Sequence, residues 1–258
     1  MVWSTPVDYF GSDTGFGETN GEIRANLRRL YNAGKVQVLV TAFGSGEYPT
    51  SSGYNAVDCA QKLGTFVLSN NLDGCDISWQ DTSAFKYGTG EQWLISFQTQ
   101  LRQILPNHTI VHSPFASYFK EDLYPNKGYA AVNTKVGAGI NFYNIKYFNQ
   151  STSKYDNYQD LFNVASGIYT GTAVNELIAK NINKNKIVIA KPVSPSDTDG
   201  SGWMDLNKLG ECLSSAYNNI NWFAGLAIWQ YSSDVRGKAM TTAAGHLKEL
   251  CAINKDCK

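Results

Sequence analysis

The sequence contains no long apolar run, no basic cluster and no C-x-x-C cysteine pair. Because a membrane span needs about 18 or more consecutive apolar residues, no transmembrane helix is expected. The 22 basic and 22 acidic residues balance, so nucleic acids and anionic membranes are not expected as partners. The five cysteines lack the spacing of zinc ligands, and we expect neither a metal nor another cofactor.

The start of the chain and its sequons bear on localisation. Met1-Val2-Trp3-Ser4 lacks the charged and apolar regions of a signal peptide, so a leader was either removed or never present. Cys251 and Cys257 are close enough in sequence to bridge a loop, although five thiols cannot all pair within one chain. Asn107-His108-Thr109 and Asn149-Gln150-Ser151 are glycosylation acceptors in a secreted protein. These features favour a secreted, cell-wall or vacuolar protein.

Aromatic residues make up 13% of the chain, including 15 tyrosines and 6 tryptophans. Sugar rings present C–H faces that pack on such side chains, so this content suits a neutral carbohydrate partner. A chain of 258 residues, 43% of them hydrophobic, can bury one large core. We therefore expect a single domain over residues 1–258.

Short apolar runs alternate with amphipathic helical patterns, as in βα units around a parallel sheet. The predicted strands are Val36–Phe43, Gly74–Ser78, Thr109–Ser113, Gly139–Tyr143, Ile187–Lys191 and Gly225–Gln230. The predicted helices are Glu22–Ala33, Asp58–Ser69, Glu91–Leu105, Thr172–Lys180, Leu206–Ala216 and Thr241–Leu250. This alternation indicates an α/β fold.

The run Asp73-Gly74-Cys75-Asp76-Ile77-Ser78-Trp79-Gln80 resembles the D-G-x-D-x-D-x-E signature of glycoside hydrolase family 18, the chitinases and endo-β-N-acetylglucosaminidases. Further segments resemble fungal and plant-type members in the order of their barrel strands. They are Thr41-Ala42-Phe43-Gly44-Ser45, His112-Ser113-Pro114, Ile140-Asn141-Phe142-Tyr143-Asn144, Lys186-Ile187-Val188-Ile189-Ala190-Lys191-Pro192 and Ala227-Ile228-Trp229-Gln230-Tyr231. The resemblance runs from about Lys35 to Asp234 and implies a (β/α)8 TIM barrel of the chitinase type.

The resemblance departs from the family at the N-terminus. The family opens with two strands before the segment that resembles Val36–Phe43, whereas only Met1–Lys35 precedes it here. Met1-Val2-Trp3-Ser4 could be at most a remnant of the second strand, so we expect an incomplete barrel without its first strand. Such a barrel has two unpaired edges that invite pairing with another chain, and self-association is a hypothesis.

In family 18 the acetamido oxygen of the sugar attacks its own anomeric carbon. The resemblance implies a Glu that protonates the leaving oxygen, an Asp two residues earlier that holds the acetamido N–H, and a sixth-strand Tyr that bonds its carbonyl oxygen. Gln80 and Ser78 occupy the Glu and Asp positions, and Tyr143 alone is retained. An amide cannot supply the proton and Ser78 is short and uncharged, so we expect no catalytic residue and no hydrolysis.

The remaining acidic residues near the signature are expected to have structural roles. Asp73 and Asp76 are read as buried hydrogen-bond partners, and Asp81 as the start of a helix. A deliberate exchange that traps substrate is the alternative interpretation of Gln80. Because a trap needs one substitution, the coincident Ser78 favours a natively inactive chain.

The resemblance also implies a ligand site at the carboxyl ends of the strands. Trp229 resembles the indole that floors the central sugar subsite, and Gln80, Tyr143, Asn144 and Phe43 would complete an aromatic-lined pocket. Plain core packing is the alternative for Phe43 and Tyr143.

Three further side chains are placed outside this site. Trp79 alternates with the inward residues of its strand, so it should face the helices. Lys146 is read as a solvated loop lysine, with an ion pair to Asp76 as the alternative. His112 is read as a polar residue with satisfied hydrogen bonds.

The sequence thus predicts a catalytically inactive chitinase-like protein that binds chitin oligosaccharides or other N-acetylglucosamine-containing glycans, as a lectin does. One alternative is a structural, storage or self-assembling protein with no sugar binding. The other is a residual hydrolase whose acid is Asp76, Glu47 or Asp197.

Overall fold

Parallel strands alternate with helices along the part of the chain that the computed structural model describes, residues 2–6, 36–234, 237–239, 241–243 and 245–246. The strands are β1 (Val2–Pro6), β2 (Gln37–Ala42), β3 (Gly74–Ile77), β4 (Thr109–His112), β5 (Phe142–Lys146), β6 (Ile187–Pro192) and β7 (Leu226–Trp229). The α-helices are α2 (Ala56–Ser69), α3 (Thr82–Lys86), α4 (Gly90–Ile104), α5 (Tyr129–Val136), α6 (Val174–Ala179) and α7 (Leu206–Ile220). Short helical turns include η3 (Gly137–Gly139) and η6 (Pro195–Asp197).

The chain divides into two compact units. The N-terminal unit comprises Met1–Pro114 and Glu121–Asn141, and the C-terminal unit comprises Phe115–Lys120 and Phe142–Lys258. In the N-terminal unit β1, β2, β3 and β4 pair in this order, all parallel, and in the C-terminal unit β6 pairs in parallel with both β5 and β7. The α/β class is confirmed, and the parallel strands are consistent with a partial TIM barrel. The complete (β/α)8 barrel and the single domain stay predictions.

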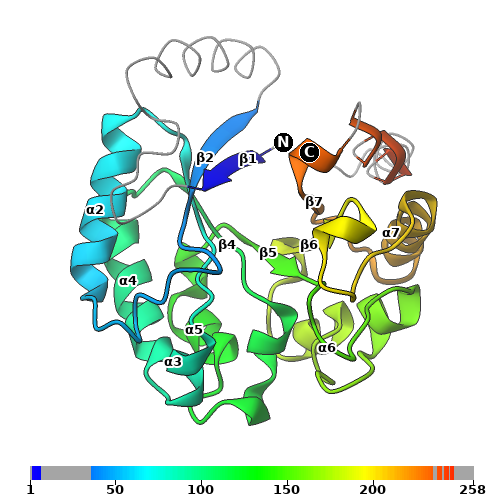
Figure 1. Cartoon of the computed structure of the whole chain (residues 1–258), viewed down its shortest axis with the longest axis horizontal. Helices are drawn as coiled ribbons and strands as arrows, with labels where there is room; N and C mark the ends of the chain where they lie inside the picture. Colours follow the sequence, from blue (N-terminus) through cyan, green and yellow to red (C-terminus); the bar gives the residue numbers. More distant parts are fainter. Residues whose placement is uncertain (1, 7–35, 235–236, 240, 244, 247–258) are drawn as a thin grey trace. The chain divides into compact units, whose positions relative to one another are not determined.

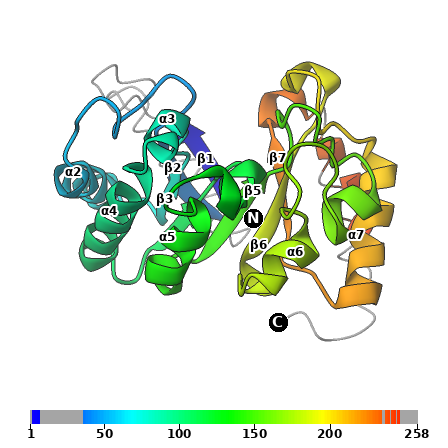
Figure 2. The ribbon, with the colours of Figure 1, turned by 90° about the horizontal axis from the view of Figure 1, so that it is seen from below.

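Helix α2 shows how the sequence builds the helical layer of the N-terminal unit. It begins after Asn55, whose side chain accepts hydrogen bonds from the backbone N–H groups of Val57 and Asp58. Its buried residues recur at helical spacing and face α4, beside which α2 lies in Figures 1 and 2. Gly64 permits this approach, because a Cβ there would lie 2.6 Å from Cγ2 of Ile104.

In the C-terminal unit, α6 and α7 lie on the same side of β6 and β7 (Figure 2). All six residues of β6 are buried, as is typical of a parallel strand covered on both faces. The exception to its apolar character is Lys191, which is 1% exposed. A buried lysine requires acceptors for its three N–H groups, and these define part of the site described below.

Five of the six predicted strands lie within one residue of the observed bounds at each end. The prediction of Gly139–Tyr143 is wrong, because β5 begins at Phe142 and continues to Lys146. The carbonyl oxygen of Gly139 accepts hydrogen bonds from Gln98 Nε2 at 2.9 Å and from Arg102 Nη2 at 2.6 Å, so η3 replaces the start of the strand.

The predicted helices agree where they fall within the described residues. Helices α2, α4, α6 and α7 overlap the predicted ranges, and α7 extends four residues beyond Ala216 to Ile220. Glu22–Ala33 lies outside the described residues, as does part of Thr241–Leu250. The segment read as at most a remnant strand forms β1 and pairs with β2 along five residues. Helix α5 was not predicted, and of α3 the sequence predicted only the start, at Asp81.

Candidate functional site

The carboxylates of the signature strand act as hydrogen-bond acceptors. Asp76 on β3 is 5% exposed, and its oxygens accept from the hydroxyl groups of Ser113 at 2.5 Å and Thr41 at 3.2 Å. Asp73, just before β3, accepts from the backbone N–H of Val38 at 2.7 Å. Both residues therefore have the supporting role predicted for them, tying neighbouring strands together.

Ser78 and Gln80 follow β3 at alternate positions and are bonded to each other. Gln80 Nε2 donates to Ser78 Oγ at 3.1 Å. Ser78 is 7% exposed, whereas Gln80 is half-buried and can still meet a ligand. Neither side chain carries a carboxyl group. The positions can thus offer hydrogen bonds to a sugar, but an amide and a hydroxyl are poor proton donors to a leaving oxygen.

Trp79 and Asp81, which flank Gln80, are both buried and belong to the helical side of the unit. The Trp79 ring lies 4.6 Å from that of Phe85 on α3, and its Nε1 donates to Thr50 Oγ1 at 3.2 Å. Asp81 is the N-cap of α3 and accepts from the backbone N–H of Ser51 at 2.7 Å. The predicted core position of Trp79 and the helix-start role of Asp81 are confirmed.

Phe43 lies in the core and not on an open face. It is 3% exposed, and its ring packs edge-on against two rings on α4. The ring centroids lie 5.7 Å apart for Trp93 and 5.6 Å apart for Phe97. A ring covered by α4 cannot stack on a sugar, so the ligand-binding role predicted for Phe43 is replaced by the core-packing alternative. We leave it out of the proposed site.

His112 has the satisfied hydrogen bonds that the sequence predicted. Its Nδ1 lies 3.1 Å from the Tyr129 hydroxyl and its Nε2 lies 3.0 Å from Gln98 Oε1. Burial lowers the pKa of the His112 ring to about 3. A neutral ring with both nitrogens engaged joins β4 to α4 and α5 and is a poor candidate for a base.

The C-terminal unit holds the other predicted ligand-binding residues. Trp229 ends β7 and is 48% exposed, so its indole offers an open platform. Tyr143 on β5 is 0% exposed and meets Phe119 edge-on at 5.9 Å, and burial raises the pKa of its phenol. Asn144 is half-buried. Of these three, Trp229 alone presents a large apolar surface to solvent.

Lys146 differs from its predicted loop position. It is the last residue of β5, and its Nζ lies 5.1 Å from the centroid of the Phe115 ring. This is the geometry of a cation–π contact. The solvated-loop interpretation is wrong because β5 runs three residues past Tyr143.

Lys191 was missed by the sequence interpretation. Its Nζ donates to the backbone carbonyl oxygens of Tyr155 at 2.6 Å, Gly202 at 2.7 Å and Tyr147 at 3.1 Å. Burial lowers the pKa of this ammonium to about 7, while the three carbonyl oxygens favour its charged form. The sequence feature that could have indicated this role is a lysine inside the otherwise apolar run Ile187–Pro192. Lys191 fixes three loop segments at the carboxyl end of β6.

Three of the five cysteines and both sequons lie within the described residues. Cys75 and Cys212 are buried free thiols and Cys59 is buried, whereas Cys251 and Cys257 lie outside the described residues. The side-chain oxygen of Asn149 accepts from the Asp199 backbone N–H at 2.7 Å, and this residue is half-buried, whereas Asn107 is exposed.

Among the residues that the structure describes, no group of three or more His, Cys, Asp or Glu side chains could hold a metal ion. Within the same part of the chain, none of the helices has the length and apolar character that a membrane crossing requires.

Comparison with known proteins gives a likeness in structure only. No protein-family model matches the sequence, and no curated protein matches it. A family 18 chitinase from Pseudoalteromonas aurantia superposes with a TM-score of 0.75 and 25% identity, over 92% of this chain and 84% of the other. A fungal family 18 endo-β-N-acetylglucosaminidase gives a TM-score of 0.68 and 15% identity, over 98% of this chain and 86% of the other. Chitinase ChiC from Aspergillus fumigatus gives a TM-score of 0.65 and 16% identity, over 85% of this chain and 73% of the other. The chain therefore has the fold of glycoside hydrolase family 18 chitinases.

Proposed function

We propose that this chain binds chitin oligosaccharides or other N-acetylglucosamine-containing glycans without hydrolysing them. The observation that carries the proposal is the pair formed by Gln80 and Ser78, whose neutral side chains are bonded at 3.1 Å where the similar signature has carboxyl groups. Losing a general acid alone lowers a rate by about 10²–10⁴. The loss of the second carboxylate removes the partner that would hold the acetamido group.

The exposed indole of Trp229 supports the binding half of the proposal. At 48% exposure it can stack on the C–H face of a sugar without any carboxylate nearby. Gln80 and Asn144 are half-buried, so each can still exchange hydrogen bonds with a hydroxyl or acetamido group. Tyr143 would contribute only if its buried ring became accessible.

Two of the three rival acids, Asp76 and Asp197, already accept hydrogen bonds from neighbouring groups. Both Asp76 oxygens accept hydrogen bonds from hydroxyl groups, those of Thr41 and Ser113. Asp197 Oδ1 accepts from Ser233 Oγ at 2.8 Å and its Oδ2 accepts from the Ser194 N–H at 3.0 Å, so it fixes the η6 turn. Carboxylates whose oxygens already accept hydrogen bonds from neighbouring groups are poorly placed to protonate a leaving group.

The experiment that tests binding is a titration with chitotetraose followed by tryptophan fluorescence. We expect a saturable change, and cellotetraose, which lacks acetamido groups, serves as the matched control. No saturable change with chitotetraose, with the chain folded by circular dichroism, would favour the structural or storage alternative. An equal response to both sugars would remove the acetamido specificity.

Self-association is the second part of the proposal. Among the described strands, β2 is the one that pairs with β1, so the other edge of β1 can accept a strand from a second copy. Light scattering over a hundredfold concentration range is expected to show a mass that rises towards that of a dimer. A constant monomer mass would reject it.

Secretion is supported by the exposed Asn107 in its sequon. Expression through a secretory pathway should yield a glycosidase-sensitive mass increase that the Asn107→Gln variant lacks. Asn149 is the control, because its side chain is half-buried, with Oδ1 accepting from Thr198 and Asp199, and is less accessible than Asn107. A glycan on Asn149, or none on Asn107, would contradict this assignment.

A further inference from the structure

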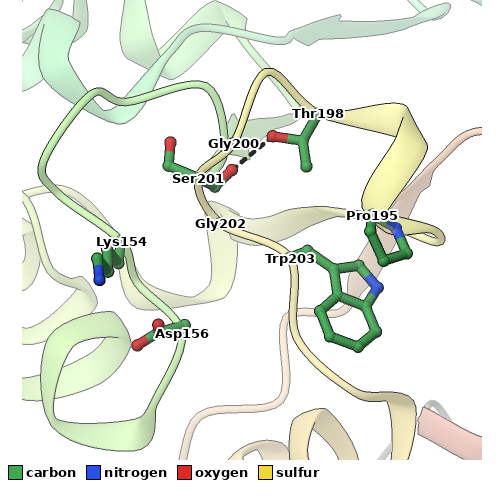
Figure 3. Close-up of a pocket in the computed structure, with 8 residues that line it drawn as sticks. All are labelled: Lys154, Asp156, Pro195, Thr198, Gly200, Ser201, Gly202 and Trp203. Atoms are coloured by element: carbon green, nitrogen blue, oxygen red, sulfur yellow. Dashed lines mark hydrogen bonds between the residues drawn. The ribbon is translucent and has the colours of Figure 1, made fainter.

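The C-terminal unit contains a pocket that none of the sequence patterns indicated. Its volume is about 280 Å³, close to the lower end of the roughly 300–1,000 Å³ typical of small-molecule sites. In Figure 3, Lys154 and Asp156 lie on one side of it, and Pro195 and Trp203 lie on the other. The segment Gly200–Trp203 runs between them. The pocket has room for about one sugar ring.

Lys191 holds the two walls of this pocket in place. Its buried ammonium donates to the carbonyl oxygen of Tyr155, which lies between Lys154 and Asp156 in the chain, and to that of Gly202, which precedes Trp203. Because both bonds are 2.7 Å or shorter and charge-assisted, the walls are preorganised, and a ligand does not have to order them.

Trp203 supplies the apolar surface of the pocket. It is 39% exposed, and its Nε1 donates to the carbonyl oxygen of Val193 at 3.3 Å, which orients the indole. The backbone N–H of the same Val193 donates to the carbonyl oxygen of Trp229 at 2.7 Å. Val193 is therefore hydrogen-bonded to the indole of Trp203 and to the backbone of Trp229, at the carboxyl ends of β6 and β7.

The charges of the opposite wall select the class of ligand. Lys154 is exposed and Asp156 is half-buried, so the wall offers an ammonium donor and a carboxylate acceptor. An anionic or a cationic ligand would meet one like charge there. A neutral ligand with several hydroxyl groups and one apolar face can use both charges and the indole.

We propose that this pocket binds one neutral sugar residue on Trp203, as a second subsite of a glycan whose other end lies on Trp229. This inference rests on the proposed glycan binding and extends it to oligosaccharides of two or more residues. Lys191 is a positioning residue here, since it acts through the backbone of Tyr155 and Gly202.

The test is fluorine NMR of the full chain labelled with 5-fluorotryptophan, with resonances assigned by single Trp→Phe substitutions. The labelled chain is titrated with N-acetylglucosamine, chitobiose and chitotetraose. We expect the Trp203 and Trp229 resonances both to shift with chitotetraose. The buried Trp79 and Trp222 resonances, both from side chains with 0% exposure, should stay in place as internal controls.

Each outcome separates the inference from the proposed function. A shift of Trp229 alone overturns the second subsite and keeps glycan binding. A shift of Trp203 alone supports the pocket and overturns the platform assigned to Trp229. No shift of either indole overturns both.

Affinity provides an independent check. Trp203→Ala should weaken chitotetraose binding roughly tenfold, as loss of a well-packed aromatic contact does, and should change N-acetylglucosamine binding at Trp229 little. Tyr87→Ala removes an exposed aromatic residue of the N-terminal unit, 82% exposed, and should leave both affinities unchanged. Equal affinities of the Trp203→Ala and unsubstituted chains for chitotetraose would overturn the proposal.

Discussion

The side-chain amide of Gln80 donates a hydrogen bond to the hydroxyl of Ser78 at 3.1 Å, so the two positions that differ from the glycosidase signature are bonded to each other. The family 18 signature that this run resembles implies an acid and an acetamido-binding carboxylate at these positions. Here they form a neutral pair that can offer hydrogen bonds but no readily transferable proton. The two changes are therefore expected to act together on activity.

Restoring both carboxyl groups should restore hydrolysis. We expect Ser78→Asp/Gln80→Glu to release reducing ends from chitotetraose, because the introduced Glu can protonate the leaving oxygen and the introduced Asp can hold the acetamido N–H. Gln80→Glu alone should be slower by about 10²-fold or more, for lack of that partner. An inert double variant that still binds chitotetraose would show that these two positions do not account for the proposed inactivity.

Trp229 should dominate glycan affinity. Trp229→Ala is expected to weaken chitotetraose binding at least about tenfold, measured by calorimetry, because it removes an exposed stacking platform. The melting temperature should change little, since surface substitutions usually stay within about 0.5 kcal/mol. Tyr231→Ala, two residues along and 75% exposed, is the matched control and should bind normally. Unchanged affinity in Trp229→Ala would refute the platform.

His112 should make the chain sensitive to acid. Its folded pKa of about 3 lies below its unfolded value of 6.5, so below pH 6.5 the unfolded chain takes up a proton that the folded chain does not. The resulting stability is present above the unfolded pKa of 6.5 and is lost as pH falls towards 3, by about 2 kcal/mol between pH 7.5 and 5.

Urea unfolding of the unsubstituted chain and of His112→Gln at pH 7.5 and 5 measures this pH-dependent part of the unfolding free energy. The substituted chain should lose less unfolding free energy over that interval. His108→Gln, close by in the same unit, serves as the control for a general effect of removing a histidine. Identical pH dependences in all three chains would contradict the account of His112.

Arg102 should be required for the junction that precedes β5. Its guanidinium donates to the carbonyl oxygens of Gly139, Leu105 and His108, with distances of 2.6 to 2.9 Å. Arg102→Lys cannot reach all three acceptors, so we expect unfolding to become easier by about 2 kcal/mol. Lys135→Arg on α5 is an exposed control. If the unfolding free energy of Arg102→Lys changed by less than about 0.5 kcal/mol, these guanidinium hydrogen bonds would be dispensable.

The sequence predicts the strands well because each central strand is a short apolar run between turns, as in Ile187–Pro192. It misplaces β5 because the Arg102 guanidinium binds the carbonyl oxygen of Gly139 and keeps this residue out of the sheet. Such tertiary hydrogen bonds do not appear in the local periodicity of the sequence. Helix α3 is five residues long and α5 eight, too short for a clear helical pattern.

The candidate site divides in the same way. The exchange at Ser78 and Gln80 is visible in the sequence because the spacing of the signature is fixed by the strand. Whether an aromatic residue faces solvent is decided by packing, which hides Phe43 beneath α4 and leaves Trp203 exposed. Residue type alone therefore predicted a role for Phe43 and missed the pocket beside Trp203.

The most direct test of the central claim is product analysis by mass spectrometry after prolonged incubation of chitotetraose with a high concentration of the unsubstituted chain. The account predicts intact tetrasaccharide, while Ser78→Asp/Gln80→Glu at the same concentration yields shorter products. Chitobiose formed by the unsubstituted chain in proportion to its concentration would contradict the claim that Ser78 and Gln80 leave the chain without a proton donor.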